Sequence, residues 1–178
     1  RGSEWLPTSP LHHLIWQAFG WEEPAWVHLS VFLKPSGKGK MSKREAAQLS
    51  NDGYSIFIKD LEYLGYLPEA VINWIALMGW SYDDRTEYFS MDDLVEKFTL
   101  EKLNPSPAVI NFSKLDHFNK LHMKKLSDRE LAKRIFPYFE KNSIKASIDE
   151  LEKISPVLKE RMITLDDSVK LCGFLFKE

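Results

Sequence analysis

The residues best suited to chemistry lie together in one short basic segment, residues 34–44. This segment contains five Lys or Arg residues, two glycines and no acid. Glycines let a backbone approach phosphate oxygens closely, and the ammonium groups of Lys40 and Lys43 bring positive charge to a polyphosphate. Ammonium groups directed at a departing pyrophosphate stabilise charge that grows in the transition state, which accelerates a reaction. The segment reads Lys34-Pro35-Ser36-Gly37-Lys38-Gly39-Lys40-Met41-Ser42-Lys43-Arg44.

Composition alone leaves a second interpretation of residues 34–44 open, namely an ordinary solvated surface loop. The Gly-x-x-x-x-Gly-Lys-[Ser/Thr] spacing of a Walker loop is absent from these residues. The glycines and the run of like charge predict a mobile, positive loop.

The elements before this loop are predicted to alternate between helix and strand. Pro10 is a good first helical residue, an apolar stripe follows at helical spacing, and Gly20 ends it, so a helix is expected over 10–19. Residues 27–33 place alternate apolar side chains on one face, which is typical of a strand, and Phe32 suggests burial of the other face as well.

Beyond Arg44 the pattern is almost entirely helical. Helices are predicted over 54–64, ended by Gly65, and over 68–79, begun by Pro68 and ended by Gly79. Ser90 resembles the cap of another helix, and residues 104–107 (Asn-Pro-Ser-Pro) form a break and a candidate boundary.

Three further helix starts are expected near the C-terminal end. Capping boxes begin at Ser127 and Ser147, and residues 164–167 form a looser version. Pro137 is predicted to kink the first of these helices, and Pro156 to start a new segment. Five tryptophans are predicted to pack within apolar helical or strand patterns: Trp16, Trp21, Trp26, Trp74 and Trp80.

The composition excludes several classes of protein. The 178 residues carry 24 Lys or Arg against 26 Asp or Glu, a net charge of -2 that makes no global case for nucleic acid. No apolar run approaches the ~18 residues of a membrane span, and no signal-peptide pattern opens the chain. The single Cys172 excludes an internal disulfide and a Cys-based zinc cluster, suits a reducing compartment, and is predicted to be a small buried hydrophobic residue. An opening Arg1 in place of Met suggests a processed chain or a fragment.

A second basic region covers residues 114–134, with seven Lys or Arg against three acids. A helix-rich patch of this kind can form an electrostatic track for the phosphates of a nucleic acid. A helix with an ordinary solvated face explains the same composition and stays open as an alternative.

Several motifs, in order along the chain, resemble those of glutamate–tRNA ligases of the bacterial type, which are class I aminoacyl-tRNA synthetases. Residues 40–44 resemble the KMSKS signature of class I, and residues 1–10 resemble the family's RGxEWxxSTP segment. Residues 65–81 resemble its GYLPEALxNYLALLGWS stretch, and Lys114-Leu115 with Asn119 falls where the family often has KLxWxN. The resemblance is weakest toward the C-terminal end.

The resemblance implies an ATP-dependent reaction in which glutamate is activated and then passed to the terminal adenosine of tRNA. Transferred to matching positions, it makes Lys40 and Lys43 catalytic groups beside the triphosphate, with Lys43 the first expected ATP contact. Arg1 and Glu4 are expected to bind glutamate, Arg1 as a bidentate partner of a carboxylate. Three further residues are expected on the ATP side: Met41 and Ser42, which hold the shape of the loop, and Trp5, for which a core position is an equal alternative.

The resemblance also implies partners and an architecture. ATP is expected as a substrate together with Mg, for which this chain offers no ligand set, and tRNA(Glu) is expected on Lys120, Lys124 and Lys125. A cytoplasmic monomer without membrane contact is expected. The expected fold is mainly α: the C-terminal piece of a Rossmann-type α/β catalytic domain with the KMSKS loop (1–44), a helical stem-contact domain (45–119) and the first part of an all-α anticodon-binding domain (120–178).

Some family features are absent or altered. No HIGH signature occurs, and the pair His12-His13 lacks its glycine, so a structural or partly exposed role is expected for both. The chain is therefore expected to be a fragment that lacks the HIGH-containing half and is inactive alone. Thr8-Ser9 reverses the usual order, Ser30 replaces a proline, His117 replaces a Trp, and residues 122–124 (His-Met-Lys) replace Tyr-Ile-Arg, where lysine keeps the charge without the fork geometry of arginine.

Other interpretations remain beside a ligase fragment. One is a non-catalytic helical module that binds tRNA. The glutamine-specific relative shares the loop motif but has β-barrels in its anticodon region, whereas helices are predicted beyond residue 120. The shortened relative that modifies a tRNA base ends before such a region.

Overall fold

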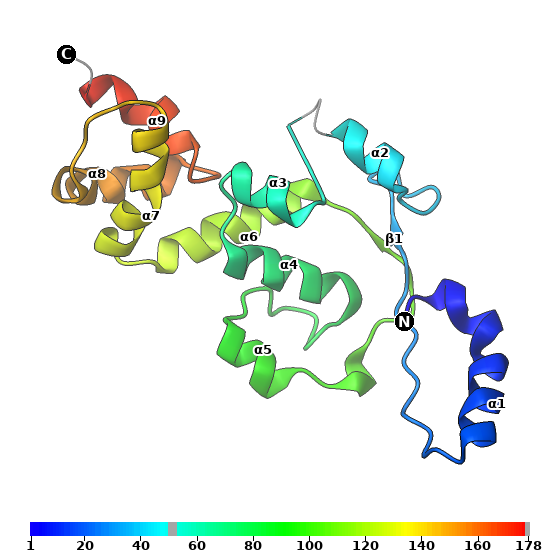
Figure 1. The fold of residues 1–178 in the computed structure, drawn as a ribbon. Helices are drawn as coiled ribbons and strands as arrows, with labels where there is room; N and C mark the ends of the chain where they lie inside the picture. The colour runs from blue at the N-terminus through cyan, green and yellow to red at the C-terminus, as the bar shows by residue number, and fades with distance from the viewer. Residues whose placement is uncertain (50–52, 177–178) are drawn as a thin grey trace.

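The structure, a computed structural model, describes residues 1–49 and 53–176 and is mainly helical, as predicted (Figure 1). The molecule is elongated in this view. Helix α1 (Ser9–Phe19) lies at one end, and helices α7 (Asp128–Lys141), α8 (Ile148–Arg161) and α9 (Asp167–Cys172) gather at the other.

The sheet is small, with β1 (Phe32–Leu33) parallel to β2 (Ala108–Val109). The predicted strand over 27–33 is therefore mostly wrong, because Leu29 makes only an isolated parallel bridge with Gly2. The backbone of residues 1–3 runs beside residues 27–29 and bonds to them, but these contacts make a single bridge and not a longer ladder. The sequence predicts only a break at residues 104–107, and strand β2, which directly follows this break, was not predicted.

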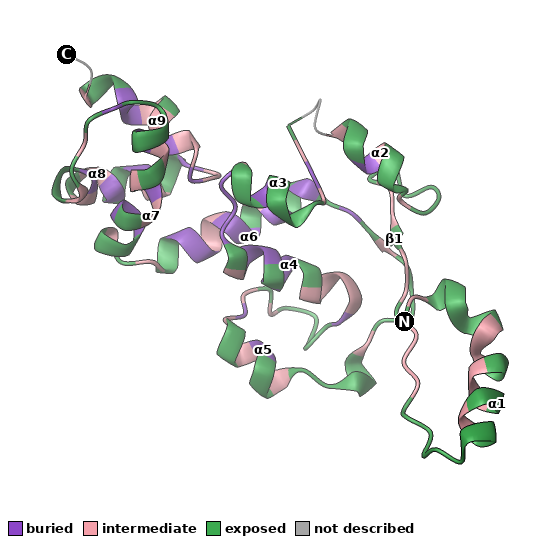
Figure 2. Ribbon diagram, viewed as in Figure 1, coloured by how far each residue is buried: buried purple, intermediate pink, exposed green. Residues whose placement is uncertain are grey.

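Helix α1 is confirmed, but it is more exposed than predicted. It follows the short 3₁₀ helix η1 (Ser3–Thr8), and Gly20 ends it in the left-handed region at φ +64°. None of its residues is buried (Figure 2). The packing role predicted for Trp21 is wrong: the side chain is 55% exposed and stacks only on Phe19 and on the edge of Trp16. Trp16 and Trp26 are half-buried.

The central part consists of short helices around a buried core. Its elements are α2 (Lys43–Gln48), α3 (Ile58–Tyr63), α4 (Pro68–Gly79), α5 (Met91–Lys97), the 3₁₀ helix η3 (Leu100–Lys102) and α6 (Phe112–Lys125). Helices α4 and α6 pack together, and Trp74, Leu115 and Phe118 are in the core between them. Pro68 and Gly79 bound α4 as predicted. Helix α3 begins four residues later than predicted, because residues 55–57 form a turn in which the Phe57 N–H donates to Ser55 Oγ.

A second core lies under α7, α8 and α9, and two polar contacts connect it to the first. The Asn119 side chain is fully buried, accepts a hydrogen bond from the Leu67 N–H at 2.8 Å and donates one to the Ile163 carbonyl at 2.5 Å. Gly65, at φ +87°, accepts from the Leu165 N–H at 2.9 Å, and a β-carbon there would lie 2.8 Å from the Asp166 nitrogen. Only glycine fits this approach.

The C-terminal helices begin where their sequence signals predict. Ser127 and Ser147 each form a complete capping box, and Ser90 does the same for α5. At the looser start, the Asp167 carboxylate accepts from two backbone N–H groups, and α9 begins at that residue. Cys172 is buried as predicted.

The new segment predicted at Pro156 is wrong, because α8 continues through that residue. Leu151 and Leu158, on either side of the proline, are buried against the neighbouring helices and hold the helix despite the lost N–H donor. Helix α7 likewise continues through Pro137.

Candidate functional site

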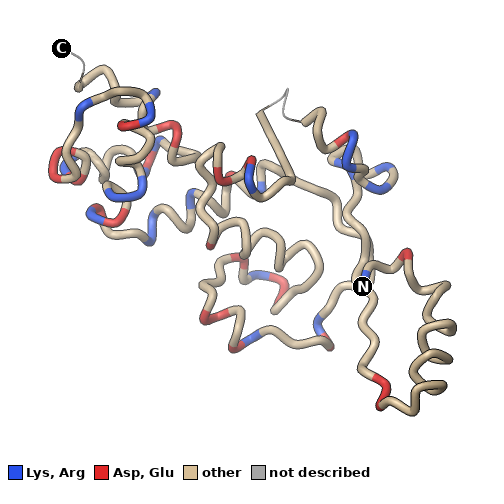
Figure 3. Tube along the Cα trace, in the orientation of Figure 1, with Lys and Arg blue, Asp and Glu red and all other residues tan. Residues whose placement is uncertain are grey.

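The basic loop is a hairpin between β1 and α2, in which backbone hydrogen bonds define the path. The Met41 N–H donates to the Phe32 carbonyl at 3.0 Å and the Lys34 N–H to the Gly39 carbonyl at 3.1 Å. Gly37 and Gly39 adopt φ +73° and +80°, the left-handed region that glycine enters without strain. The loop thus turns back tightly, and its basic residues follow one another along the hairpin, which is the blue stretch of the trace in Figure 3.

The end of the hairpin is joined firmly to helix α2. The Met41 side chain packs on the central core. Ser42 is the N-cap of α2 and forms a capping box with Glu45. Lys34 lies 2.5 Å from Glu45, and this contact, together with the Ser42 hydroxyl, lowers the pKa of Glu45 to about 2. Both residues predicted to shape the loop therefore have structural contacts that do so.

Lys43, the first residue of α2, differs from Lys40 in its surroundings. Its side chain is exposed and has no ion-pair partner among the described residues, and the same is true of Lys38 and Arg44. Lys40 is paired, with Nζ 2.6 Å from Oε1 of Glu4. The loop therefore offers three uncompensated positive charges to an anion.

A small pocket of about 290 Å³ lies beside the start of the chain and is lined by Arg1, Gly2, Trp5 and His12. The backbone of Arg1 bonds to Leu29 and holds the first residues against the extended segment that precedes β1. The Arg1 guanidinium lies over the Trp26 ring at 5.6 Å, a cation–π contact. Trp5 is 53% exposed. It therefore forms a wall of this pocket and does not lie in a core.

Of the predicted site residues, Arg1 and Trp5 line this pocket. Glu4 connects the pocket to the hairpin through Lys40, over 36 positions of sequence. Lys43 is not one of the residues that line this pocket. Sequence reasoning missed Gly2 and His12 as lining residues, and nothing in their local pattern identifies them.

The histidines of α1 are partly exposed, in agreement with the prediction. His13 Nδ1 lies 2.7 Å from Oε2 of Glu23, and the His12 ring tilts against the Trp26 ring at 6.2 Å. These contacts hold α1 to the segment after it.

The lysines predicted to bind tRNA lie on the last two turns of α6. Lys124 is paired with Glu160 at 2.9 Å, and Lys125 lies over the Tyr88 ring at 5.6 Å. Lys120 is half-buried and has no ion pair among the described residues. The basic region is thus partly neutralised in three dimensions; ion pairs also join Lys114 to Glu87, Arg129 to Asp149 and Glu152, and Arg134 to Glu69.

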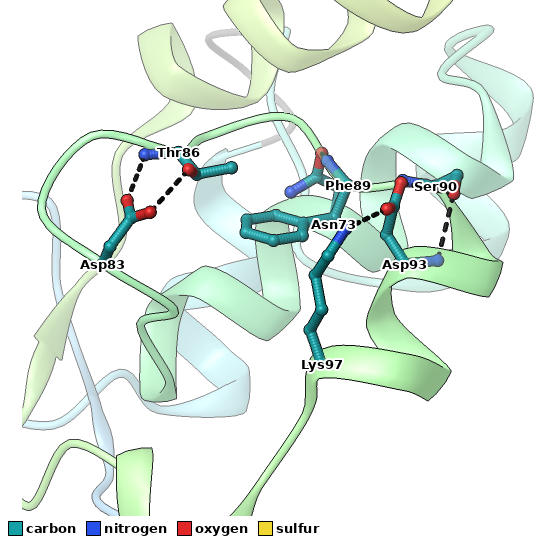
Figure 4. Close-up of polar contacts among 7 residues, drawn as sticks. All are labelled: Asn73, Asp83, Thr86, Phe89, Ser90, Asp93 and Lys97. Atoms are coloured by element: carbon teal, nitrogen blue, oxygen red, sulfur yellow. Dashed lines mark hydrogen bonds and ion pairs between the residues drawn. The ribbon is translucent and has the colours of Figure 1, made fainter.

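A buried polar network supports the segment between α4 and α5. Asn73 is fully buried: its Oδ1 accepts from the Phe89 N–H at 2.9 Å, and His122 Nε2 lies 3.0 Å from the same oxygen. Figure 4 shows this segment continuing to Ser90, where Asp93 completes the cap and accepts from Lys97. At its other side, Asp83 accepts from the backbone and side chain of Thr86. Burial lowers the pKa of His122, so the neutral ring fits this network.

Neither a metal centre nor a membrane-spanning helix is found in the part of the chain that the structure describes. Within residues 1–49 and 53–176, no three His, Cys, Asp or Glu side chains lie together in a way that suits a metal ion, magnesium included. Among the helices of the same residues, none has the length and apolar character to cross a membrane.

Comparison with known proteins gives a consistent assignment. The family model described as "tRNA synthetases class I (E and Q), catalytic domain" matches residues 1–117. The chain is 40% identical to the glutamate–tRNA ligase of Herpetosiphon aurantiacus, over 99% of this chain and 35% of that protein, and 36% identical to the one of Borreliella burgdorferi, over 100% and 36%. It therefore spans about a third of the length of these curated relatives.

A solved structure agrees with the sequence matches. The crystal structure of a glutamate tRNA ligase from Elizabethkingia meningosepticum, in complex with its amino acid, superposes with a TM-score of 0.84 at 34% identity, covering 99% of this chain and 37% of that one. The match of the family model over most of the chain, on the residues that form the pocket and the hairpin, shows that this chain belongs to the class I tRNA synthetases of the glutamate and glutamine group.

Proposed function

We propose that this chain is part of an ATP-dependent glutamate–tRNA ligase, which activates glutamate as glutamyl-adenylate and transfers it to the 3′ end of tRNA(Glu). The observation that carries the proposal is the pocket at Arg1 and Trp5, which Glu4 and Lys40 connect to a hairpin with exposed cations. The proposal is also supported by the similarity of this chain, over nearly its whole length, to glutamate–tRNA ligases.

In the proposed reaction, an oxygen of the glutamate α-carboxylate forms a bond to the α-phosphorus of ATP, and pyrophosphate leaves as the bond to its bridging oxygen breaks. Negative charge grows on the departing pyrophosphate, where the ammonium groups of Lys43 and Lys40 stabilise it. The Arg1 guanidinium binds a glutamate carboxylate, Glu4 at the pocket edge accepts from the ammonium group of the glutamate, and the exposed Trp5 ring borders the nucleotide. Met41 and Ser42 set the path of the loop through their contacts with the core and with α2.

The domain assignment remains part of the proposal. Residues 1–44 would complete the catalytic domain, 45–119 would form the stem-contact domain, and 120–178 would begin the anticodon-binding domain. The last boundary lies inside α6, so that this helix belongs to both parts. Lys120, Lys124 and Lys125 on its last turns would face tRNA phosphates, and a cytoplasmic monomer that is inactive without the HIGH-containing half is proposed.

The test is glutamate-dependent exchange of pyrophosphate into ATP by the complete enzyme. Lys43→Ala is expected to slow exchange by roughly ten- to a thousandfold, as for loss of one charge donor to the transition state. Lys38→Ala is the matched control, because Lys38 is an exposed lysine of the same hairpin without an ion pair in the described structure. Equal exchange rates for both variants would remove Lys43 from the mechanism.

A helical tRNA-binding module without chemistry is the second candidate. Lys125 favours it, because its ammonium lies on the Tyr88 ring instead of a carboxylate and stays available to phosphate. This candidate predicts that the chain binds tRNA but that joining it to a HIGH-containing half produces no exchange. Exchange in the joined protein excludes it.

A further inference from the structure

The side chain of Glu4 folds back over Gly2 and occupies the space that a β-carbon at residue 2 would take. A β-carbon built on residue 2 would lie 2.1 Å from Oε2 of Glu4 and 2.7 Å from its carboxyl carbon. The Gly2 backbone has φ −73° and ψ 149°, an ordinary extended conformation that any residue adopts. A larger residue at position 2 would therefore displace the Glu4 carboxylate, which is the far end of a flexible side chain, and would leave the path of the backbone unchanged.

The position that the glycine permits is the one from which Glu4 reaches Lys40. Oε1 lies 2.6 Å from the Lys40 ammonium, and this hydrogen bond is the main cause that lowers the pKa of Glu4. Both side chains remain substantially exposed, 41% for Glu4 and 56% for Lys40. An exposed pair of this kind is weak and open to competition from another anion.

The pair also lies at the right place for such competition. Lys40 stands opposite Leu33 at the base of the hairpin, and Gly2 and Trp5, on either side of Glu4 along the chain, line the 290 Å³ pocket. The contact thus bridges the pocket and the loop, whereas Lys43 has no such partner among the residues that the structure describes.

We propose that Glu4 competes with ATP for Lys40. The Glu4 carboxylate accepts from the Lys40 ammonium where a phosphate oxygen of ATP would, and the triphosphate must displace it. The identity of the phosphate ligand rests on the proposed function. An ammonium group donates to a carboxylate or a phosphate oxygen with similar geometry, and a triphosphate brings more negative charge than one carboxylate. The pair thereby keeps Lys40 neutralised and held at the pocket edge, and it releases Lys40 only to a competing polyanion.

The test measures the binding of inorganic triphosphate to this chain by calorimetry at fixed salt. Glu4→Gln removes the competing charge, and Gly2→Ala displaces the carboxylate while it leaves every charge in place. Both are expected to tighten binding about two- to fivefold, the range for release of one exposed ion pair. Glu22→Gln is the control, because Glu22 is exposed and has no ion pair in the described residues, so that it reports the effect of net charge alone. Binding in both variants no tighter than in Glu22→Gln, or no binding at all, overturns the proposal.

A second measurement follows Glu4 itself. Carboxyl NMR titration should show the pKa of Glu4 rising toward its ordinary value when triphosphate saturates the chain, because Lys40 has moved to the phosphate. An unchanged Glu4 titration in the saturated state contradicts displacement. The result is separable from the ligase assay: exchange that depends on Lys43 with unaltered triphosphate binding refutes the competitor alone, and tightened binding without any exchange refutes the ligase alone.

Discussion

Replacing Asn119 with alanine should destabilise the chain strongly, although the side chain is small and far from the pocket. The Leu67 N–H, itself fully buried, would lose its acceptor, and a buried donor left unpaired costs about 1–3 kcal/mol. The hydrogen bond to the Ile163 carbonyl would be lost as well, at about 0.5–1.5 kcal/mol. The expected loss in free energy of unfolding is therefore about 1.5–4.5 kcal/mol.

The assay is urea unfolding of the 178-residue chain followed by far-UV circular dichroism, with the midpoint compared at constant slope. Asn104→Ala is the matched control, because Asn104 is exposed and accepts only a local hydrogen bond from the Ser106 N–H at 2.9 Å. Its loss should stay within about 0.5–1 kcal/mol. If Asn119→Ala costs no more than this control, Asn119 does not connect the two cores as inferred.

Three further outcomes are expected. Gly65→Ala should unfold at lower urea than Gly53→Ala, because both glycines have φ near +80° but only Gly65 faces a backbone within 3 Å; equal midpoints would refute the close approach. The chain should lose stability as the pH falls through 6.5, because burial lowers the pKa of folded His122 and the unfolded state then binds the proton first; His122→Gln should reduce this loss, and an unaltered pH dependence would refute its burial as the cause. Binding of tRNA should weaken steeply with added salt and less steeply in Lys125→Ala, whereas salt-insensitive binding would exclude a phosphate track.

Helix starts could be predicted from the sequence because their signals are local. The Ser127, Ser147 and Ser90 caps each use a carboxylate three residues away, within the same turn. The β1–β2 pair could not be predicted, because Leu33 meets Val109 through contacts that no local pattern records. Burial of Leu151 and Leu158 overrides the signal of Pro156 in the same way, through packing that only the folded chain contains.

The same distinction, between local signals and contacts made only by folding, applies to the candidate site. Lys40 and Lys43 are identified by a short motif, because a basic glycine-containing hairpin needs adjacent residues. The partner of Lys40 could not be predicted, since Glu4 reaches it over 36 positions of sequence, with its carboxylate folded back over Gly2. The basic region was likewise a property of composition, and pairs such as Lys124 with Glu160 reduce its charge only after folding.

Helix α6 sets the rotation of one end of the molecule relative to the other. Its 14 residues form a rod of about 21 Å, which starts beside the sheet, where the Ile110 N–H bonds to the Leu33 carbonyl, and ends against α8. Insertion of one residue in the rod would turn everything beyond it by about 100° around the axis. Leu115 and Met123 could then no longer face their separate cores together, so the number of residues in α6 sets the angular register between the hairpin and the C-terminal helices.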